Sequence, residues 1–215
     1  MLDGCNLSAR AQLNRTLTSV LVAGLICAVP HAANAQQKVL LFLAGGATGF
    51  AMHESGHVVL DLAMGVPPGL KKVTFGPIPF FAVTHDPVSP PREFAISSAG
   101  FWVQEATNEI LLARHMGAPH SLRDEDAMFR KGIVAFNVLA SVAYPVGAFA
   151  EVGPPERDPH GMAVSSGISE RVIGGVILTP AVLDAVRYYR PDDAWVRWVS
   201  RAAKVGGVLL IVKAK

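Results

Sequence analysis

The stretch Met52-His53-Glu54-Ser55-Gly56-His57-Val58 lies inside the apolar run of residues 39–64 and contains the pattern HExxH. In a helix, the side chains of His53 and His57 lie one above the other on one face, so both imidazoles can reach a single metal ion. Glu54 points to a neighbouring face, where it can take a proton from a metal-bound water. The stretch therefore predicts a helix that carries a metal site.

The apolar setting of the pattern strengthens this interpretation. Accidental matches to HExxH should fall mainly in polar, exposed sequence, where His and Glu are common. Titratable residues in the middle of an apolar helix are costly unless a partner satisfies them, and a bound Zn²⁺ would do so. The alternative is a pair of helix histidines that hydrogen-bond to their neighbours. We prefer the zinc site.

The composition indicates a membrane protein. Of the 215 residues, 51% are hydrophobic and 17% are charged, and the mean hydropathy is +0.35. A typical soluble domain has about 25% charged residues, so this chain has fewer charged residues and is more apolar than such a domain. The net charge is only +2, and no lysine-rich tract is present, which excludes a nucleic-acid partner. The expected location is a lipid bilayer, the inner (plasma) membrane of a bacterium.

Residues 1–35 have the organisation of a signal peptide. Arg10 and Arg15 form a basic region, residues 17–29 are apolar, and Ala33-Asn34-Ala35 fits a small-residue cleavage site. The alternative is an uncleaved first membrane helix. The domain that carries the site is then residues 36–215.

The cysteines restrict the ligands of a metal in that domain. Cys5 and Cys27 are the only two, and both lie in the signal segment. If the segment is removed, thiolate ligands and disulfides are excluded. A metal must then be held by His, Asp or Glu.

The rest of the chain predicts an all-α polytopic membrane protein with about four transmembrane helices after the signal segment. Residues 40–63 are long enough to cross a bilayer, and their first half contains several glycines that let another helix approach closely. The other expected helices are residues 94–112, 132–150 and 168–189. We expect 151–166 to be a loop, 114–131 a loop or surface helix, and 205–212 an interfacial or partial helix.

Between the first two core helices the pattern predicts a small β-hairpin. Lys72-Val73-Thr74-Phe75 and Phe81-Ala82-Val83-Thr84 flank a loop that contains Gly76, Pro77 and Pro79. A plain connecting loop at the membrane surface is the alternative. A hairpin in this place would leave one strand edge free.

A catalytic zinc site needs a third protein ligand and an open position for water. Among the acids, Asp184, Glu105 and Glu109 are the candidates. His85, His115 and His120 are less favoured because they lie in polar loops, where a histidine is usually solvated. Glu109 would give the arrangement of soluble metalloproteases. Asp184 has a structural alternative as a helix-end aspartate that pairs with Arg187 or Arg190.

Three features together resemble the site-2 protease family of intramembrane metalloproteases. HExxH at His53 to His57 lies in an apolar helix near the start. Ser98-Ala99-Gly100-Phe101-Trp102-Val103-Gln104 stands where that family often has Gly-Pro-x-x-Asn. Leu183-Asp184-Ala185 is similar to the family's Leu-Asp-Gly motif. Phe101, Gln104 and Ala185 differ from the family pattern, so the chain would be a divergent member.

The resemblance implies an intramembrane zinc endopeptidase that hydrolyses peptide bonds of membrane-anchored protein substrates. It implies that Asp184 is the third zinc ligand beside His53 and His57, and that Glu54 is the general base. Gln104, with Asn108 on the same polar row, is expected to contact the substrate. An extended substrate could add a strand to the free hairpin edge. The alternative function is a non-catalytic metal-binding or partner-binding membrane protein.

Overall fold

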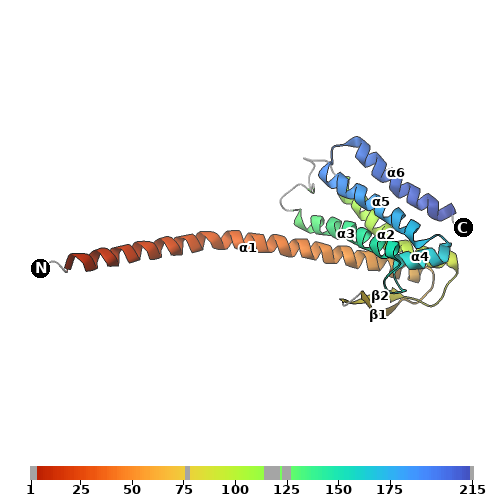
Figure 1. Ribbon diagram of the computed structural model, residues 1–215, viewed down its shortest axis with the longest axis horizontal. Coiled ribbons are helices and arrows are strands. Elements are labelled where there is room, and N and C mark those ends of the chain that lie inside the picture. Colours follow the sequence, from red (N-terminus) through yellow and green to blue (C-terminus); the bar gives the residue numbers. More distant parts are fainter. Residues whose placement is uncertain (1–3, 76–77, 114–121, 123–126, 214–215) are drawn as a thin grey trace. The chain divides into compact units, whose positions relative to one another are not determined.

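The computed structural model describes residues 4–75, 78–113, 122 and 127–213 (Figure 1). Most of the described residues lie in helices, and the described part of the chain also contains one two-stranded antiparallel sheet, which confirms the predicted helical fold with a small hairpin. The helices are α1 (Gly4–Ala63), α2 (Pro90–Leu112), α3 (Met128–Ala150), α4 (Asp158–Ser166), α5 (Glu170–Tyr189) and α6 (Ala194–Lys213). The strands are β1 (Gly69–Phe75) and β2 (Ile78–Thr84).

The chain divides into two compact units, Met1–Leu41 and Phe42–Lys215. The second, which we call the core unit, contains the HExxH pattern and every contact described below. The first unit consists of the beginning of α1. A signal peptide at residues 1–35 stays a prediction.

The HExxH helix ends where glycine permits a left-handed turn. Gly65 has φ +71°, and the amide of Val66 donates to the carbonyl of Asp61 at 2.9 Å. Such a turn closes a helix because glycine has no Cβ to oppose the positive φ. Pro67 and Pro68 follow and prevent the helix from continuing. The prediction of a helix over residues 40–63 is therefore confirmed.

The hairpin lies between α1 and α2, as predicted. β1 and β2 pair in antiparallel register from Gly69 opposite Thr84 to Phe75 opposite Ile78. The two turn residues, 76 and 77, lie outside the described residues. Lys71 of β1 pairs with Glu156, which lies in the loop before α4. This ion pair attaches the hairpin to the rest of the core unit.

The helices of the core unit pack around an apolar cluster. α3 packs along α5, α2 packs on α4, and α6 packs on α5. The cluster combines residues of α2, α4 and α5, namely Phe94, Phe101, Met162, Ile173 and Ile177. Apolar side chains at these helix interfaces hold α4 against α2 and so fix the start of α4 in space.

α1 and α3 approach each other through glycine. A Cβ on Gly45 would lie 1.9 Å from the carbonyl oxygen of Phe129, and one on Gly132 would lie 2.0 Å from that of Phe42. Both contacts are with backbone atoms, which cannot move aside as a side chain can. The close helix approach predicted from the glycines of residues 40–63 therefore occurs here, against α3.

Two elements differ from the sequence prediction. Helix α6 runs from Ala194 to Lys213 and is longer than the interfacial or partial helix expected at residues 205–212. Residues 151–166 were expected to form a loop, but α4 begins at Asp158. Its sequence contains ordinary helix signals: an acid and Pro159 in the first turn, and Gly167 as a left-handed residue with φ +72° after the end. Residues 114–131, expected as a loop or surface helix, lie mostly outside the described residues.

Two of the described helices, α3 and α5, are long and apolar enough to cross a membrane. Each contains one proline inside a continuous helix, Pro145 in α3 and Pro180 in α5, and both prolines are buried. A proline cannot donate a backbone hydrogen bond, and in an apolar environment groups of neighbouring helices can satisfy the carbonyl that it leaves free.

We expect Gly132→Ala to destabilise the core unit, because the added methyl group meets the backbone of α1. Overpacking of this kind costs about 1–3 kcal/mol, or several degrees in melting temperature. Thermal unfolding of the purified protein in detergent measures the effect. The matched control is Gly175→Ala in α5, where a Cβ meets nothing within 4 Å, so its melting temperature should stay equal or rise slightly. Equal melting temperatures for all three proteins would contradict the close helix contact.

Candidate metal centre

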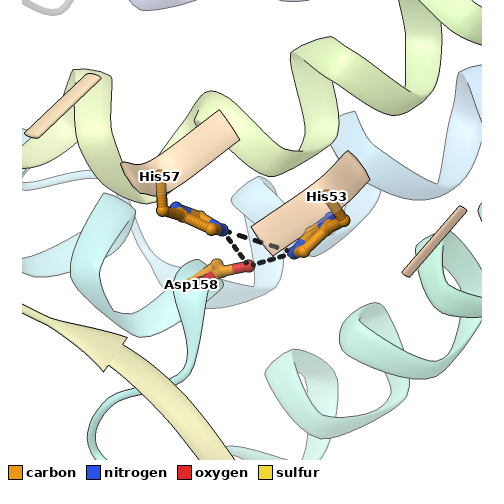
Figure 2. A group of neighbouring side chains, drawn as sticks. All are labelled: His53, His57 and Asp158. Atoms are coloured by element: carbon orange, nitrogen blue, oxygen red, sulfur yellow. Dashed lines mark hydrogen bonds and ion pairs between the residues drawn. The ribbon is translucent and has the colours of Figure 1, made fainter. Parts of the chain in front are cut away.

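Two imidazoles of α1 and one carboxylate of α4 face one another in the core unit (Figure 2). Nε2 of His53 lies 3.0 Å from Oδ2 of Asp158, and Nε2 of His57 lies 3.5 Å from the same oxygen. The two Nε2 atoms are 3.4 Å apart. Among the described residues, this is the group of His, Cys, Asp and Glu side chains that can hold a metal ion.

The distances fit the ligand set of a tetrahedral zinc ion. Ligand atoms placed at 2.0–2.1 Å from one zinc at tetrahedral angles lie about 3.3 Å from one another. The three sides of the observed triangle, 3.0, 3.4 and 3.5 Å, are close to that value. Two His and one Asp also leave the fourth position open, which is the composition of catalytic zinc sites.

A backbone hydrogen bond fixes the proton of His57. Its Nδ1 lies 2.7 Å from the carbonyl oxygen of Ile96 in α2. A carbonyl oxygen can only accept, so Nδ1 carries a hydrogen in either charge state of the ring. The proton that a metal ion would displace from a positively charged His57 is therefore the one on Nε2. That atom faces Asp158. Metal-binding histidines commonly have such a donor bond on the side away from the metal.

His53 fits against the backbone of α2 because residue 100 is glycine. A Cβ on Gly100 would lie 2.4 Å from Cε1 of the His53 ring. The rings of Phe101 and Tyr144 complete the wall, with centroids 5.4 Å and 5.7 Å from that of His53. A Cβ on Gly56 would lie 2.9 Å from the carbonyl oxygen of Ala99. The small residues at 98–100 therefore make room for an imidazole.

Asp158 is held in place by ion pairs of the two residues before it. Glu156 pairs with Lys71 of the hairpin. Arg157 makes two parallel bonds to Glu170 at the start of α5, with donor–acceptor distances of 2.7 and 2.8 Å. A two-bond pair of this kind fixes orientation as well as position. The carboxylate of Asp158 is therefore presented to α1 by a restrained segment.

The electrostatics of Asp158 favour the charged form that a metal ligand requires. Burial raises the pKa of its carboxyl. The positive charge of His57 and the hydrogen bonds from both imidazoles outweigh burial and hold the pKa below its usual range. A carboxylate that stays ionised is available to a cation.

Glu54 lies near this group. Its carboxylate is within electrostatic range of His53, His57 and Asp158. The predicted general base is therefore in the vicinity of the histidines and of the third ligand, as its place between the two histidines in the sequence implies.

The prediction of Asp184 as third ligand is corrected. Its carboxylate accepts hydrogen bonds from Asn108 at 3.0 Å and Ser200 at 2.8 Å, and it lies 2.9 Å from Nζ of Lys204. It also lies 3.7 Å from Arg187, the partner expected in the structural alternative. Position 184 faces α2 and α6, so Asp158 is the acid that completes the group instead.

The other predicted acids and amides belong to the same buried polar network as Asp184. Glu109 pairs with Arg187 and Arg201, and Glu105 pairs with Lys204. Asn108 accepts a hydrogen bond from Asn137, and Gln104 accepts one from Ser141. None of these four residues belongs to the metal-binding group of the described chain. We call this set, with Asp184 and Ser200, the polar network.

The histidines considered as further ligands are elsewhere. His85 lies 3.5 Å from Glu93 and is not in the metal-binding group. His115 and His120 lie outside the described residues.

Asp158 was missed because it stood in a segment assigned to a loop. The signal that could have found it is the helix start Arg157-Asp158-Pro159, with Gly167 as the stop, which places an acid in the first turn of a short helix. No local pattern shows that this turn lies beside α1. That position depends on pairs that are distant in sequence, Lys71 with Glu156 and His53 with Asp158, which are 85 and 105 residues apart.

Comparison with protein-family models, with curated proteins and with solved structures finds no match for this chain. The geometry of the metal centre is therefore the ground on which a function can be proposed.

The two candidate acids give opposite expectations for metal binding. Asp158→Ala should abolish binding of one zinc per chain, because it removes a ligand. Asp184→Asn should retain the zinc but lower the stability by roughly 3–5 kcal/mol, because Lys204 loses a buried partner. Metal content after dialysis, together with thermal unfolding in detergent, checks both. Zinc lost on changing residue 184 but kept on changing residue 158 would contradict the assignment.

We further expect Gly100→Ala to weaken zinc binding by at least about tenfold, because the methyl group displaces the His53 ring from its position. Titration of the metal-free protein with zinc against a competing chelator measures the affinity. Gly175→Ala again serves as the control, since its methyl group faces open space. An affinity that Gly100→Ala leaves unchanged would show that the ring does not need this space.

Proposed function

We propose that this protein is an intramembrane zinc endopeptidase that cleaves membrane-anchored protein substrates and is similar to the site-2 proteases. The observation that carries the proposal is the convergence of both HExxH imidazoles with the carboxylate of Asp158, at distances that suit zinc. The proposed ligand set is His53, His57 and Asp158.

The roles of the residues follow from ordinary metalloprotease chemistry. A zinc ion in this site would polarise the scissile carbonyl and make a water acidic near neutral pH. Glu54 accepts the proton of the attacking water and then passes it to the leaving amine. His57 is kept in the required tautomer by Ile96, and Arg157 and Glu170 hold the third carboxylate in position.

The surface of the helices supports an environment of lipid. The outer face of α6 has five large exposed apolar side chains, Trp195, Trp198, Val199, Val205 and Leu209, between 45% and 67% exposed. Their spacing places them on one side of the helix. Contiguous apolar surface of this kind is rare on soluble monomers, and two tryptophans at one end are typical of a membrane–water interface.

About four transmembrane helices are part of the proposal. α3 and α5 have the length and hydropathy of membrane spans. We add residues 42–63 of α1, which contact α3 through Gly45, and helix α2, which packs on both α3 and α5. The polar network makes such a bundle acceptable in lipid, since its acids are paired with Arg187, Arg201 and Lys204. Charged groups inside a membrane normally face the bundle interior and one another.

The hairpin is the proposed place for the substrate. A two-stranded sheet has two edges, and an extended peptide can pair with an edge through backbone hydrogen bonds. Lys71 of β1 pairs with Glu156, which stands two positions before Asp158 in the sequence, so this strand lies near the segment that carries Asp158. A substrate strand on this sheet would therefore run near the metal centre.

We expect Glu54→Gln to retain one zinc per chain and to lose cleavage by about 10²–10⁴-fold, because the proton acceptor is removed while the ligands stay. The measurement uses full-length protein in a host membrane, together with a panel of tagged single-span reporter proteins. Fragments are quantified by immunoblot, and the metal by analysis of purified protein. Glu151→Gln, a change in an exposed ion pair with Arg171, is the control for a substitution that should leave cleavage detectable.

The alternative function, a non-catalytic metal-binding membrane protein, has its own outcome in this experiment. It predicts zinc in both proteins and no fragment that depends on Glu54. A chain that binds no zinc at all would leave only the partner-binding alternative. Reporter cleavage that is equal in wild type and Glu54→Gln would rule out the proposed peptidase.

A further inference from the structure

One ring nitrogen of His53 is buried and has no hydrogen-bond partner among the described residues. The residue is 2% exposed, and the nitrogen in question is Nδ1. Nε2 faces Asp158, so a neutral ring that binds an ion through Nε2 carries its hydrogen on Nδ1. Metal-binding histidines almost always donate that hydrogen to an acceptor, as His57 does to the carbonyl oxygen of Ile96. The donor on His53 therefore needs an acceptor of its own.

The side-chain amide of Gln104 in α2 is a second buried donor of this kind. The residue is 1% exposed. Its Oε1 accepts a hydrogen bond from Ser141 at 3.1 Å, while its Nε2 has no partner within the described part of the chain. An amide nitrogen can only donate, so this group too needs an acceptor.

The register of α1 and α2 turns these two donors toward the same space. The helices run antiparallel, because His57 contacts Ile96 while His53, one turn earlier, lies against Gly100, one turn later. A Cβ on Gly100 would lie 2.6 Å from Nδ1 of His53. Gln104 follows by one further turn of α2. Side chains lean toward the N-terminus of their own helix, so in antiparallel helices the imidazole and the amide lean toward each other.

Asn137 of α3 brings an acceptor to this space. Its Nδ2 donates to the backbone carbonyl of Gln104 at 3.5 Å and to Oδ1 of Asn108 at 2.9 Å. Its Oδ1 lies 3.3 Å from the position that a Cβ on Gly49 would occupy, and Gly49 precedes His53 by one turn of α1. An amide oxygen can only accept. Two donors and one acceptor thus meet where α1, α2 and α3 come together.

A water molecule suits this set of groups. The nitrogens of His53 and Gln104 cannot bond to each other directly, because both carry hydrogen and neither has a lone pair to offer. A water oxygen can accept from both, and its own hydrogen can be donated to Asn137. Buried waters typically make about three hydrogen bonds to polar groups that otherwise have no partner. A cation is excluded, since two of the three groups would present hydrogen to it.

We propose that the metal centre includes a site for one buried water, which is held by Gln104 and Asn137 and positions His53 by accepting the hydrogen of Nδ1. The inference rests on the metal centre of the proposed function. Gln104 is then a positioning residue that acts on His53 through the water, in place of the substrate contact expected from the sequence. It supports one imidazole as the carbonyl of Ile96 supports the other.

The first test is the zinc affinity of Gln104→Met, measured on full-length, metal-free protein in detergent by competition with a chelator. Methionine has a similar size but cannot hold the water, so the affinity should fall about 10–100-fold. The matched control is Ser200→Ala, which removes a buried hydrogen bond of the polar network to Asp184 and should leave the zinc affinity unchanged. Equal losses in the two variants would show a general effect on the fold and overturn the inference.

The second test is nuclear magnetic resonance on the zinc-loaded wild type, which needs no variant. With isotope-labelled histidine, each ligand ring should give a signal from the hydrogen on Nδ1. The hydrogen of His57 donates to a carbonyl oxygen and should show no Overhauser effect to water, while that of His53 should show one. The signal with the water contact should also be the one that shifts in Gln104→Met. Should Gln104→Met not fold, the water contact in wild type decides.

The outcomes distinguish this inference from the proposed function. If Gln104→Met binds zinc as tightly as wild type, the positioning role is wrong while the metal centre stands. If wild type binds no zinc, both the centre and the positioning role are wrong. Reporter cleavage that is lost in Gln104→Met at unchanged zinc affinity would assign Gln104 to the substrate and overturn the inference. A wild type in which neither ligand ring contacts water would overturn it as well.

Discussion

The approach of two buried imidazoles to one carboxylate oxygen constrains more of this chain than any other contact. It requires a helix that presents His53 and His57 on one face, and a second helix whose first turn supplies Asp158. It also requires space, which Gly100 provides by bringing the backbone of α2 against an imidazole ring. Two imidazoles and one carboxylate that are buried this close together are stable when they share a proton or bind a common cation. Most of the local sequence around the centre can be understood as serving that requirement.

The polar network is a second constraint, separate from the first. Three acids, Glu105, Glu109 and Asp184, are paired with the basic side chains of Arg187, Arg201 and Lys204. The pairs connect α2, α5 and α6. Breaking such a pair is far more costly than replacing it whole, since a lone charge would remain buried. The network therefore gives α5 and α6 a defined place on the helix that also carries Gly100.

The sequence could predict features whose cause is local. HExxH in an apolar run predicts a helix with both histidines on one face, and the glycine and proline residues after it predict the hairpin; both are observed. Asp184 was misassigned because an acid in an apolar helix suits either a ligand or an ion pair, and the residues that decide, Asn108 and Lys204, are far away in sequence. Asp158 could not be found from the sequence because the contacts that place it are also distant in sequence. Its helix had local signals, but its position beside α1 depends on pairs that are distant in sequence, Lys71 with Glu156 and His53 with Asp158.

The ion pair between Lys71 and Glu156 joins the hairpin to the chain two residues before Asp158. Because the side chain of Lys71 is 61% exposed, water and salt screen this pair, so it joins the strand to the segment of Asp158 only loosely. The two parallel bonds between Arg157 and Glu170 join largely buried side chains, and they therefore restrain the segment of Asp158 more strongly than the hairpin does.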